Sequence, residues 1–164
     1  MKIIAFDPSG SFKYGSGTSG WCIMEDTNFE IIKLGNIKAK DYETKELYFK
    51  AHIDLLEKEK LSVLVIENFI LYKGTASSMV NKELETSELI GYIAGKAAEL
   101  NMKVYRQNSQ EIKTVLKKSN IILNILNHRK EQIVFKKTKK DRQQWYYQGK
   151  RISNHIIDAI RHAV

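Results

Sequence analysis

The chain has 164 residues, of which 43% are hydrophobic and 28% are charged, so it can build its own core and we expect a single domain over residues 1–164. Its one cysteine, Cys22, excludes an internal disulfide and a cysteine-based metal site. The first apolar run ends at Asp7, which is too short for a signal peptide or a membrane span, and we therefore expect a cytoplasmic protein.

The net charge of +8 is unevenly distributed along the chain. Residues 101–151 hold 14 Lys and Arg against 3 Asp and Glu, a net charge of +11, while the rest of the chain carries −3. Such asymmetry predicts a polyanionic partner, although a solvated basic surface explains a charge run equally well. Trp145, Tyr146 and Tyr147 lie among these charges and favour nucleic acid, because aromatic side chains can stack on bases.

The first part of the chain predicts an antiparallel meander. Residues 9–20 hold four glycines and four serines and predict a loop, and residues 26–28 predict a polar turn. The segments around these connections predict three strands: residues 2–7, 21–25 and 30–39.

The middle of the chain alternates helices and strands. Residues 42–60 predict an amphipathic helix, whose apolar face we assign to Leu47, Ile53, Leu55 and Leu56. Residues 62–67 are almost wholly apolar, as in a strand buried on both faces. A second helix over 83–101 and a short strand over 103–106 follow.

The last third is harder to interpret. Ser109 is a suitable N-cap for another helix. Residues 119–151 combine a helix-like apolar piece at 121–126 with a very basic loop or hairpin, and residues 153–164 predict a closing helix.

Three separate segments carry metal-binding side chains. Asp7 and Glu67 each end a predicted buried strand, where α/β sheets open onto a ligand-binding crevice. His155 and Asp158 lie three residues apart and so share one helix face. Carboxylates suit Mg²⁺ or Mn²⁺, and two such ions can hydrolyse a phosphodiester. A turn Asp after a strand and ordinary surface residues on a helix are the simpler explanations, so the hypothesis depends on the whole constellation.

The motifs as a set resemble the RuvC-like Holliday junction resolvases of the RNase H-like superfamily. They are FDPSG around Asp7, GTSGW at 17–21, IEN ending at Asn68, and HIIDA at 155–159. The small size and high Lys content resemble bacteriophage versions. The resemblance implies an α/β, RNase H-like fold with a mixed five-stranded sheet, three antiparallel strands and then two parallel ones, flanked by helices.

The resemblance also implies roles for the site residues. Asp7 would be shared between two Mg²⁺ or Mn²⁺ ions, Glu67 would bind one and Asp158 the other. His155 would bind metal or transfer a proton, and the sequence leaves both open. The implied activity is metal-dependent cleavage of four-way junctions and other branched DNA, such as forks, flaps and Y-structures, by a homodimer. Residues 83–101 are our candidate dimer face, with core packing as the alternative.

Further residues are candidates for DNA binding. Phe69 and Tyr72 follow the second carboxylate and are candidates for a wedge against bases, with core burial as the alternative for Phe69. The remaining candidates are basic, with simple solvation as their alternative: Lys73, Lys113, Lys117, Lys118, Lys136, Lys137, Lys139, Lys140 and Arg142.

Three other functions compete with a junction-cutting endonuclease. One is a non-catalytic protein that binds branched nucleic acid on the same fold. Another is an RNase H that cuts RNA in RNA–DNA hybrids. A third is an actin-like phosphotransferase, for which the chain lacks a second lobe. The sequence predicts neither the breadth of branched substrates nor any base preference at the cut.

Overall fold

The computed structural model describes residues 1–69, 84–108, 111, 112, 114, 133–137 and 143–164, with the backbone alone for 133–137 and 143. Its centre is a five-stranded sheet in the order β3-β2-β1-β4-β5. The strands are β1 (Lys2–Asp7), β2 (Thr18–Glu25), β3 (Glu30–Lys38), β4 (Val63–Glu67) and β5 (Lys103–Gln107). The β1–β2 and β2–β3 pairs are antiparallel, whereas β1–β4 and β4–β5 are parallel. The predicted mixed sheet is therefore confirmed.

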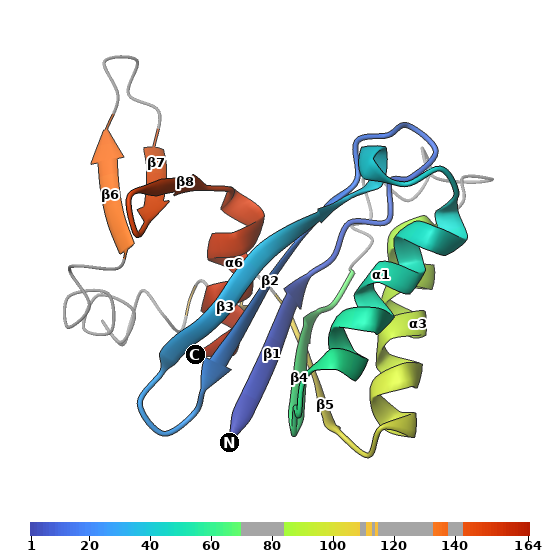
Figure 1. Ribbon diagram of the computed structural model, residues 1–164, viewed down its shortest axis with the longest axis horizontal. Helices are drawn as coiled ribbons and strands as arrows, with labels where there is room; N and C mark the ends of the chain where they lie inside the picture. Colours follow the sequence, from blue (N-terminus) through green and yellow to red (C-terminus); the bar gives the residue numbers. More distant parts are fainter. Residues whose placement is uncertain (70–83, 109–110, 113, 115–132, 138–142) are drawn as a thin grey trace.

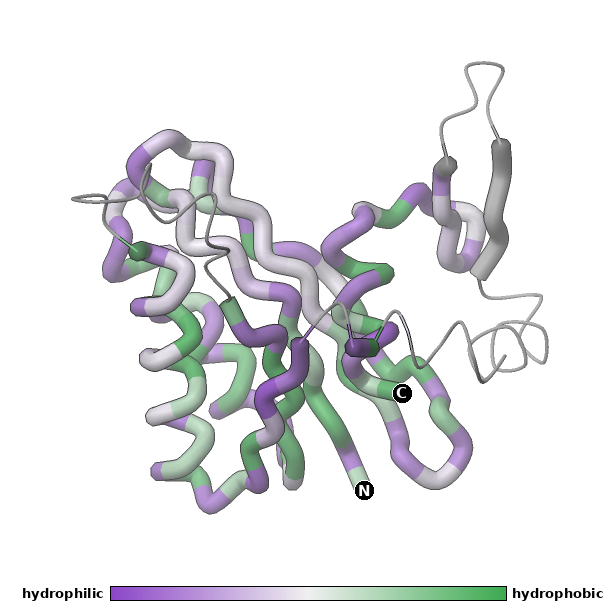
Figure 2. Tube along the Cα trace, turned by 180° about the vertical axis from the view of Figure 1, so that it is seen from behind, coloured by the Kyte–Doolittle hydropathy of each residue, from purple (hydrophilic) through white to green (hydrophobic). Residues whose placement is uncertain are grey.

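Helices cover both faces of this sheet (Figure 1). On one face lie α1 (Lys45–Lys58) and α3 (Glu85–Glu99), and on the other lies α6 (Asn154–Ala163). The central strands are apolar along most of their length (Figure 2), as strands buried on both faces must be.

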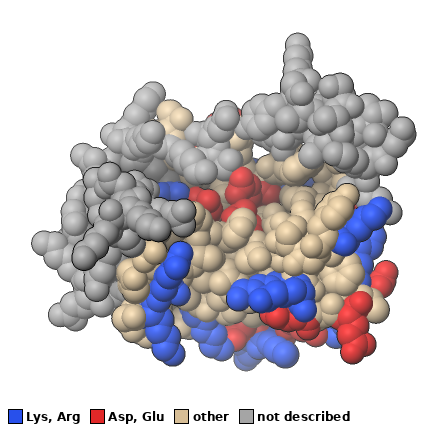
Figure 3. Space-filling model, turned by 90° about the horizontal axis from the view of Figure 1, so that it is seen from above, with Lys and Arg blue, Asp and Glu red and all other residues tan. Residues whose placement is uncertain are grey.

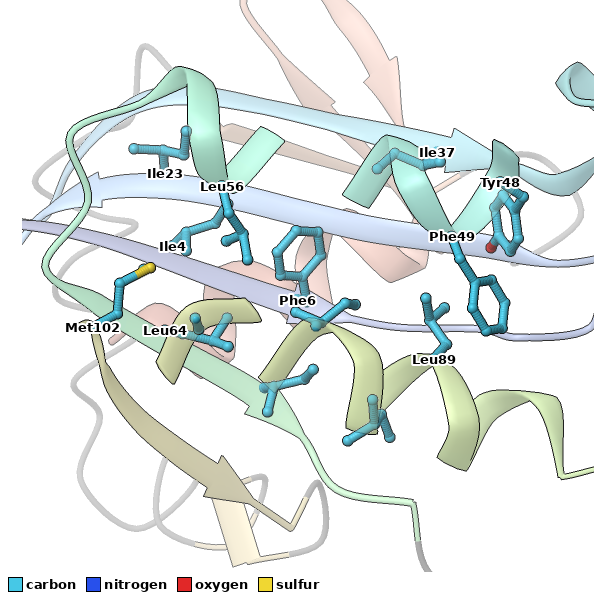
Figure 4. Close-up of a cluster of buried hydrophobic side chains, with 14 of the residues drawn as sticks. Ile4, Phe6, Ile23, Ile37, Tyr48, Phe49, Leu56, Leu64, Leu89 and Met102 are labelled. Atoms are coloured by element: carbon cyan, nitrogen blue, oxygen red, sulfur yellow. The ribbon is translucent and has the colours of Figure 1, made fainter. Parts of the chain in front are cut away.

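The larger core cluster lies between the sheet and the helices α1 and α3 (Figure 4). Alternate residues of β1, Ile4 and Phe6, point into it and are fully buried. Tyr48 on α1 and Leu89 on α3 pack there too. A smaller cluster lies under α6 and takes the intervening β1 residue, Ala5. The two-residue alternation of the strand thus divides its side chains between two cores.

A second, three-stranded antiparallel sheet precedes α6. It consists of β6 (Ile133–Lys137), β7 (Gln143–Tyr147) and β8 (Lys150–Ile152), in that order. Gln148 and Gly149 form the two-residue turn between β7 and β8, both with positive φ, as a right-twisted hairpin requires. The expectation of a basic loop or hairpin in this region was therefore incomplete, because it missed β8.

Most other elements agree with the sequence within a few residues. The helix expected from 42 begins at Lys45, because a 3-10 turn, η1 (Ala39–Asp41), comes first and Thr44 accepts a hydrogen bond from Leu47 N as the N-cap. The apolar face assigned to α1 was wrong at Leu47, whose side chain is exposed. That face is built instead around Tyr48, Phe49 and His52. The apolar piece at 121–126 and the cap at Ser109 lie outside the described residues.

No helix in the described ranges has the length and apolar character needed to cross a membrane. The single-domain organisation and the cytoplasmic location stay predictions.

Candidate active site

The register of two parallel strands brings Asp7 and Glu67 together. Phe6 on β1 pairs with Ile66 on β4, so the next residues of the two strands lie side by side at the same sheet edge. Phe6 and Ile66 both belong to the core under α1 and α3. Strand alternation therefore directs Asp7 and Glu67 to the opposite face, the one that α6 covers.

Asp7 is the more buried of these two carboxylates, with its side chain 14% exposed. Burial raises the pKa of Asp7, and the negative charge of Glu67 raises it further. A hydrogen bond from His155 acts in the opposite direction by stabilising the charged form. The two strand-end acids thus form a close pair of like charges that favours a positively charged neighbour.

The start of α6 is held against the main sheet by its cap. Ser153 accepts a hydrogen bond from Ile156 N at 3.2 Å, and its hydroxyl donates to Asn36 Oδ1 on β3 at 2.7 Å. Gly20 on β2 allows the close approach, because a Cβ there would lie only 2.2 Å from the backbone of His155. Gly20 also pairs directly with Asp7. The same glycine therefore brings the helix and the first carboxylate together.

His155 contacts Asp7 directly. Its Nδ1 lies 2.6 Å from Asp7 Oδ2, a short, charge-assisted hydrogen bond. This hydrogen bond raises the pKa of His155, and the negative charges of Asp158 and Glu67 raise it further. The other three residues expected at the site from the sequence are therefore all within electrostatic reach of His155.

Asp158 has a cationic partner of its own helix. Arg161 donates to Asp158 Oδ1 at 2.6 Å, a spacing that places the two side chains on neighbouring turns. Arg161 is therefore paired with the carboxylate that, by the family resemblance, would bind a metal ion.

His162 is a site residue that the sequence reasoning missed. Its Nε2 lies 3.1 Å from Glu67 Oε2 and its Nδ1 lies 2.9 Å from Gln107 Oε1. The side chain is almost fully buried, so these contacts fix both partners. The signal was present in the sequence, because His162 follows His155 by seven residues and Asp158 by four and therefore shares their helix face.

The loop after β1 is anchored beside the site. Phe12 N donates to the Glu85 carboxylate at 2.9 Å, and Gly10 N donates to Thr86 Oγ1 at 3.0 Å, both at the start of α3. A Cβ on Gly10 would lie 2.1 Å from the Glu85 backbone, so the loop needs glycine there. The glycine-rich segment thus packs directly on the helix.

Seen from above, acidic side chains gather in the middle of the molecule's upper face, with uncharged residues around them (Figure 3). This face lies at the carboxyl ends of β1 and β4 (Figure 1). Within the described residues, no group of three or more His, Cys, Asp or Glu is placed to hold a metal ion as it stands. In this structure His155 is the partner of the Asp7 carboxylate and Arg161 is the partner of the Asp158 carboxylate.

Of the residues expected to bind DNA, the structure describes only Phe69, Lys136 and Lys137. Phe69 is half-buried and packs against the larger core cluster, as its core-burial alternative predicts, so it is not a freely exposed wedge. Lys136 and Lys137 lie in β6, opposite Gln144 and Gln143 of β7, as the hairpin alternative for this region predicts. The other candidates lie outside the described residues: Tyr72, Lys73, Lys113, Lys117, Lys118, Lys139, Lys140 and Arg142.

Comparison of the whole structure with solved structures identifies the fold. T. thermophilus RuvC in complex with a Holliday junction substrate is similar over 99% of this chain and 90% of that chain, with a TM-score of 0.62 and 13% sequence identity. The chain has a RuvC-like fold. A prototype foamy virus protease–reverse transcriptase is also similar, over 77% of this chain and 19% of that one, but its TM-score of 0.35 and 12% identity carry no argument.

No family model and no curated protein matches the sequence. The RuvC-like fold, which the motifs around Asp7, Glu67 and His155 predicted, is therefore confirmed by three-dimensional similarity alone. The bacteriophage origin, the homodimer and the role of α3 as its interface stay predictions.

Proposed function

We propose that this protein is a metal-dependent endonuclease that cuts branched DNA, including four-way junctions. The observation that carries the proposal is the convergence of Asp7, Glu67, His155 and Asp158 from two strand ends and one helix. The RuvC-like fold supports it, because the similar T. thermophilus protein is bound to a Holliday junction substrate.

The donor set fits divalent cations. Three carboxylates offer the hard oxygen ligands that Mg²⁺ and Mn²⁺ prefer. Burial and the charge of Glu67 already raise the pKa of Asp7, so a cation beside the pair would relieve an existing repulsion. Asp7, Glu67 and Asp158 would hold the ions, with Asp158 exchanging Arg161 for metal. Bound ions would supply the charge that activates water and stabilises the leaving oxygen.

His155 is suited to move a proton in this reaction. Asp7 accepts the hydrogen bond from Nδ1, which fixes the ring and leaves Nε2 as the nitrogen for a reacting molecule. In phosphodiester hydrolysis the water oxygen bonds to phosphorus, the bond to the leaving oxygen breaks, and a base takes the proton of the water. His155 would be that base, because its hydrogen bond to Asp7 holds the ring in place beside the carboxylates.

His162 and Gln107 would position Glu67 for this reaction. Because the His162 ring is almost fully buried between β4, β5 and α6, it restricts the rotation of the Glu67 carboxylate. Such outer contacts typically affect metal affinity by about 10- to 100-fold.

The test is cleavage of end-labelled four-way, three-way and linear DNA, and of an RNA–DNA hybrid, with Mg²⁺ and with Mn²⁺. We expect cuts at branch points in DNA. Asp7→Asn should slow cleavage by about 100-fold or more, since it removes a charge required in the transition state. The same variant should still bind the junction in EDTA.

Asp54→Asn is the matched control, because Asp54 is a carboxylate on α1 that pairs only with Lys50 at the surface among the described residues. It should cleave like the unaltered protein. Normal cleavage by Asp7→Asn would contradict the assignment of the site. Preferred cutting of the hybrid would instead identify an RNase H.

A non-catalytic branched-DNA-binding protein is the second candidate. It is favoured by the contacts that already satisfy the acids, Arg161 with Asp158 and His162 with Glu67. Junction binding without any cleavage under either metal ion would decide for it.

A further inference from the structure

A groove adjoins the active site and is lined by residues of both the main sheet and the small sheet. It has a volume of about 530 Å³ and is open to solvent. His155 is among its lining residues, and its walls come from β2, β3, β7, β8 and the first residues of α6. A volume of this size matches pockets that enclose a small molecule, and it is too small for a DNA duplex.

Among the described residues that line the groove, the charged ones are basic. Lys38, the last residue of β3, and Arg151, on β8, both line it and both are exposed. In the part of the chain that the structure describes, no Asp or Glu lines the groove, and neither cation forms an ion pair with a carboxylate. A Lys and an Arg that face one groove from separate sheets are suited to a phosphate, which Arg can bind through two parallel hydrogen bonds.

An aromatic surface lies in the same groove. Trp145 on β7 is half-buried, packing against the core under α6 while it also lines the groove. Indole rings stack on nucleic-acid bases of any sequence. Bases within a duplex already stack on their neighbours, so a base must leave the duplex to reach Trp145.

The geometry points to a binding site for one unpaired nucleotide of the DNA strand, directly beside the phosphate to be cut. Lys38 and Arg151 hold its phosphate and Trp145 stacks on its base. The position relative to the cut rests on the proposed nuclease function, whereas nucleotide binding itself does not. The site gives a physical reason for selecting branched DNA, because branch points release unpaired nucleotides more readily than linear duplex does.

The experiment measures binding without cleavage. The chain has two tryptophans, so Trp21→Phe leaves Trp145 as the only tryptophan and its fluorescence as a local reporter. In EDTA, a short oligothymidylate should quench that fluorescence, and a linear duplex should not. Trp145→Phe, in the otherwise unaltered chain, should keep most of the affinity. Trp145→Leu keeps apolar packing but loses stacking, and should weaken binding of the oligothymidylate about 5-fold or more.

The two cations are tested by salt dependence. Each of Lys38→Gln and Arg151→Gln should lower the slope of log K against log salt by about 0.7, the value for one lost phosphate contact on a single strand. Lys103 is exposed on β5, at the opposite edge of the main sheet from β3. Lys103→Gln removes the same charge and should leave the slope unchanged.

The outcomes separate this inference from the proposed function. Quenching and reduced slopes in a protein that cuts no DNA would support the groove and contradict the nuclease. Cleavage of junctions with no quenching, or with slopes equal to that of Lys103→Gln, would contradict the groove and leave the nuclease standing. If Trp145→Leu does not fold, the fluorescence quenching and the salt dependence of Lys38→Gln and Arg151→Gln still test the inference.

Discussion

The two faces of the main sheet are covered in different ways. Two helices, α1 and α3, cover one face and bury a large apolar cluster with Phe6, Tyr48 and Phe49. Among the described helices, the ten-residue α6 is the one that covers the other face, and its side chains reach the strand-end acids. Apolar burial therefore dominates one face, whereas hydrogen-bonded polar groups lie at the edge of the other.

The contrast shows how one sheet can be both stable and chemically active. On the α6 face, His155 and His162 each have a carboxylate partner. On the opposite face, His52 is also buried, but its Nε2 has no hydrogen-bond partner among the described residues. We therefore expect changes under α1 and α3 to alter mainly stability, and changes near α6 to alter mainly activity.

The largest effect on stability is expected for Leu64→Ala. Leu64 is fully buried in the cluster under α1 and α3, and removing it should cost about 2–5 kcal/mol of unfolding free energy. Urea denaturation measures this loss. Cleavage by the variant, assayed where it stays folded, should remain close to normal. A loss below about 1 kcal/mol would contradict the division between the two faces, since such a small cost is typical of surface sites.

His52 should make the protein sensitive to acid. Burial lowers the pKa of His52 from 6.5 to about 4, so between these values the unfolded chain binds a proton that the folded chain does not. Stability should therefore fall as the pH drops from about 6.5 to 4, by at most about 3 kcal/mol. Denaturation midpoints across this range would show it, and His52→Leu should flatten the fall. If the stability of His52→Leu fell equally steeply over this pH range, the loss would be caused by other titrating groups.

Gly20→Ala should disturb the α6 face. The added Cβ would meet the His155 backbone at 2.2 Å, and overpacking of this kind costs about 1–3 kcal/mol. Because α6 must shift, the His155–Asp7 contact is broken and cleavage should fall more steeply than stability. Thermal unfolding and cleavage rates, measured together, test the claim. Unchanged cleavage would mean that α6 need not lie this close.

His162 links stability to activity on the α6 face. His162→Ala leaves Glu67 and Gln107 without their buried partner and should cost about 1–3 kcal/mol. It should also raise the Mn²⁺ concentration needed for half-maximal cleavage, because Glu67 is no longer held. His162→Gln keeps a donor and should recover part of both losses. An unchanged metal requirement in His162→Ala would limit the residue to a structural role.

The smallest effect is expected on the outer surface of α3. Gly95 is exposed in the middle of the helix, and a Cβ there would contact nothing within 4 Å. Gly95→Ala should therefore stabilise the protein by about 1 kcal/mol. The measurement also bears on the dimer prediction. A loss of stability together with a smaller mass in light scattering would show that this surface is covered by a second copy.

Much of the fold could be predicted because its signals are local. The apolar run of β1 ends at Asp7 and that of β4 at Glu67, as the sequence indicates. The closing helix expected over 153–164 is α6, which begins after the N-cap Ser153. The turn at Gln148 and Gly149 was not predicted, because its first residue is not the Asn, Asp or Gly that usually marks a two-residue hairpin turn.

Other features could not be predicted because they depend on distant parts of the chain. Leu47 has the right spacing for the apolar face of α1, yet it is exposed, because spacing gives the face of a helix and not what lies against it. The role of Gly20 depends on α6, which is more than 130 residues away in the sequence. The Lys38–Arg151 groove likewise combines two sheets that share no sequence pattern.

The sequence by itself predicted the five strands of the main sheet, the helices α1, α3 and α6 to within a few residues, and the four candidate site residues, because side-chain alternation and helix periodicity depend only on near neighbours. The tertiary structure decided the partners of those residues: Arg161 for Asp158, His162 for Glu67 and His155 for Asp7. Strand register and the approach of α6 set these distances, and both result from packing the whole chain around two cores.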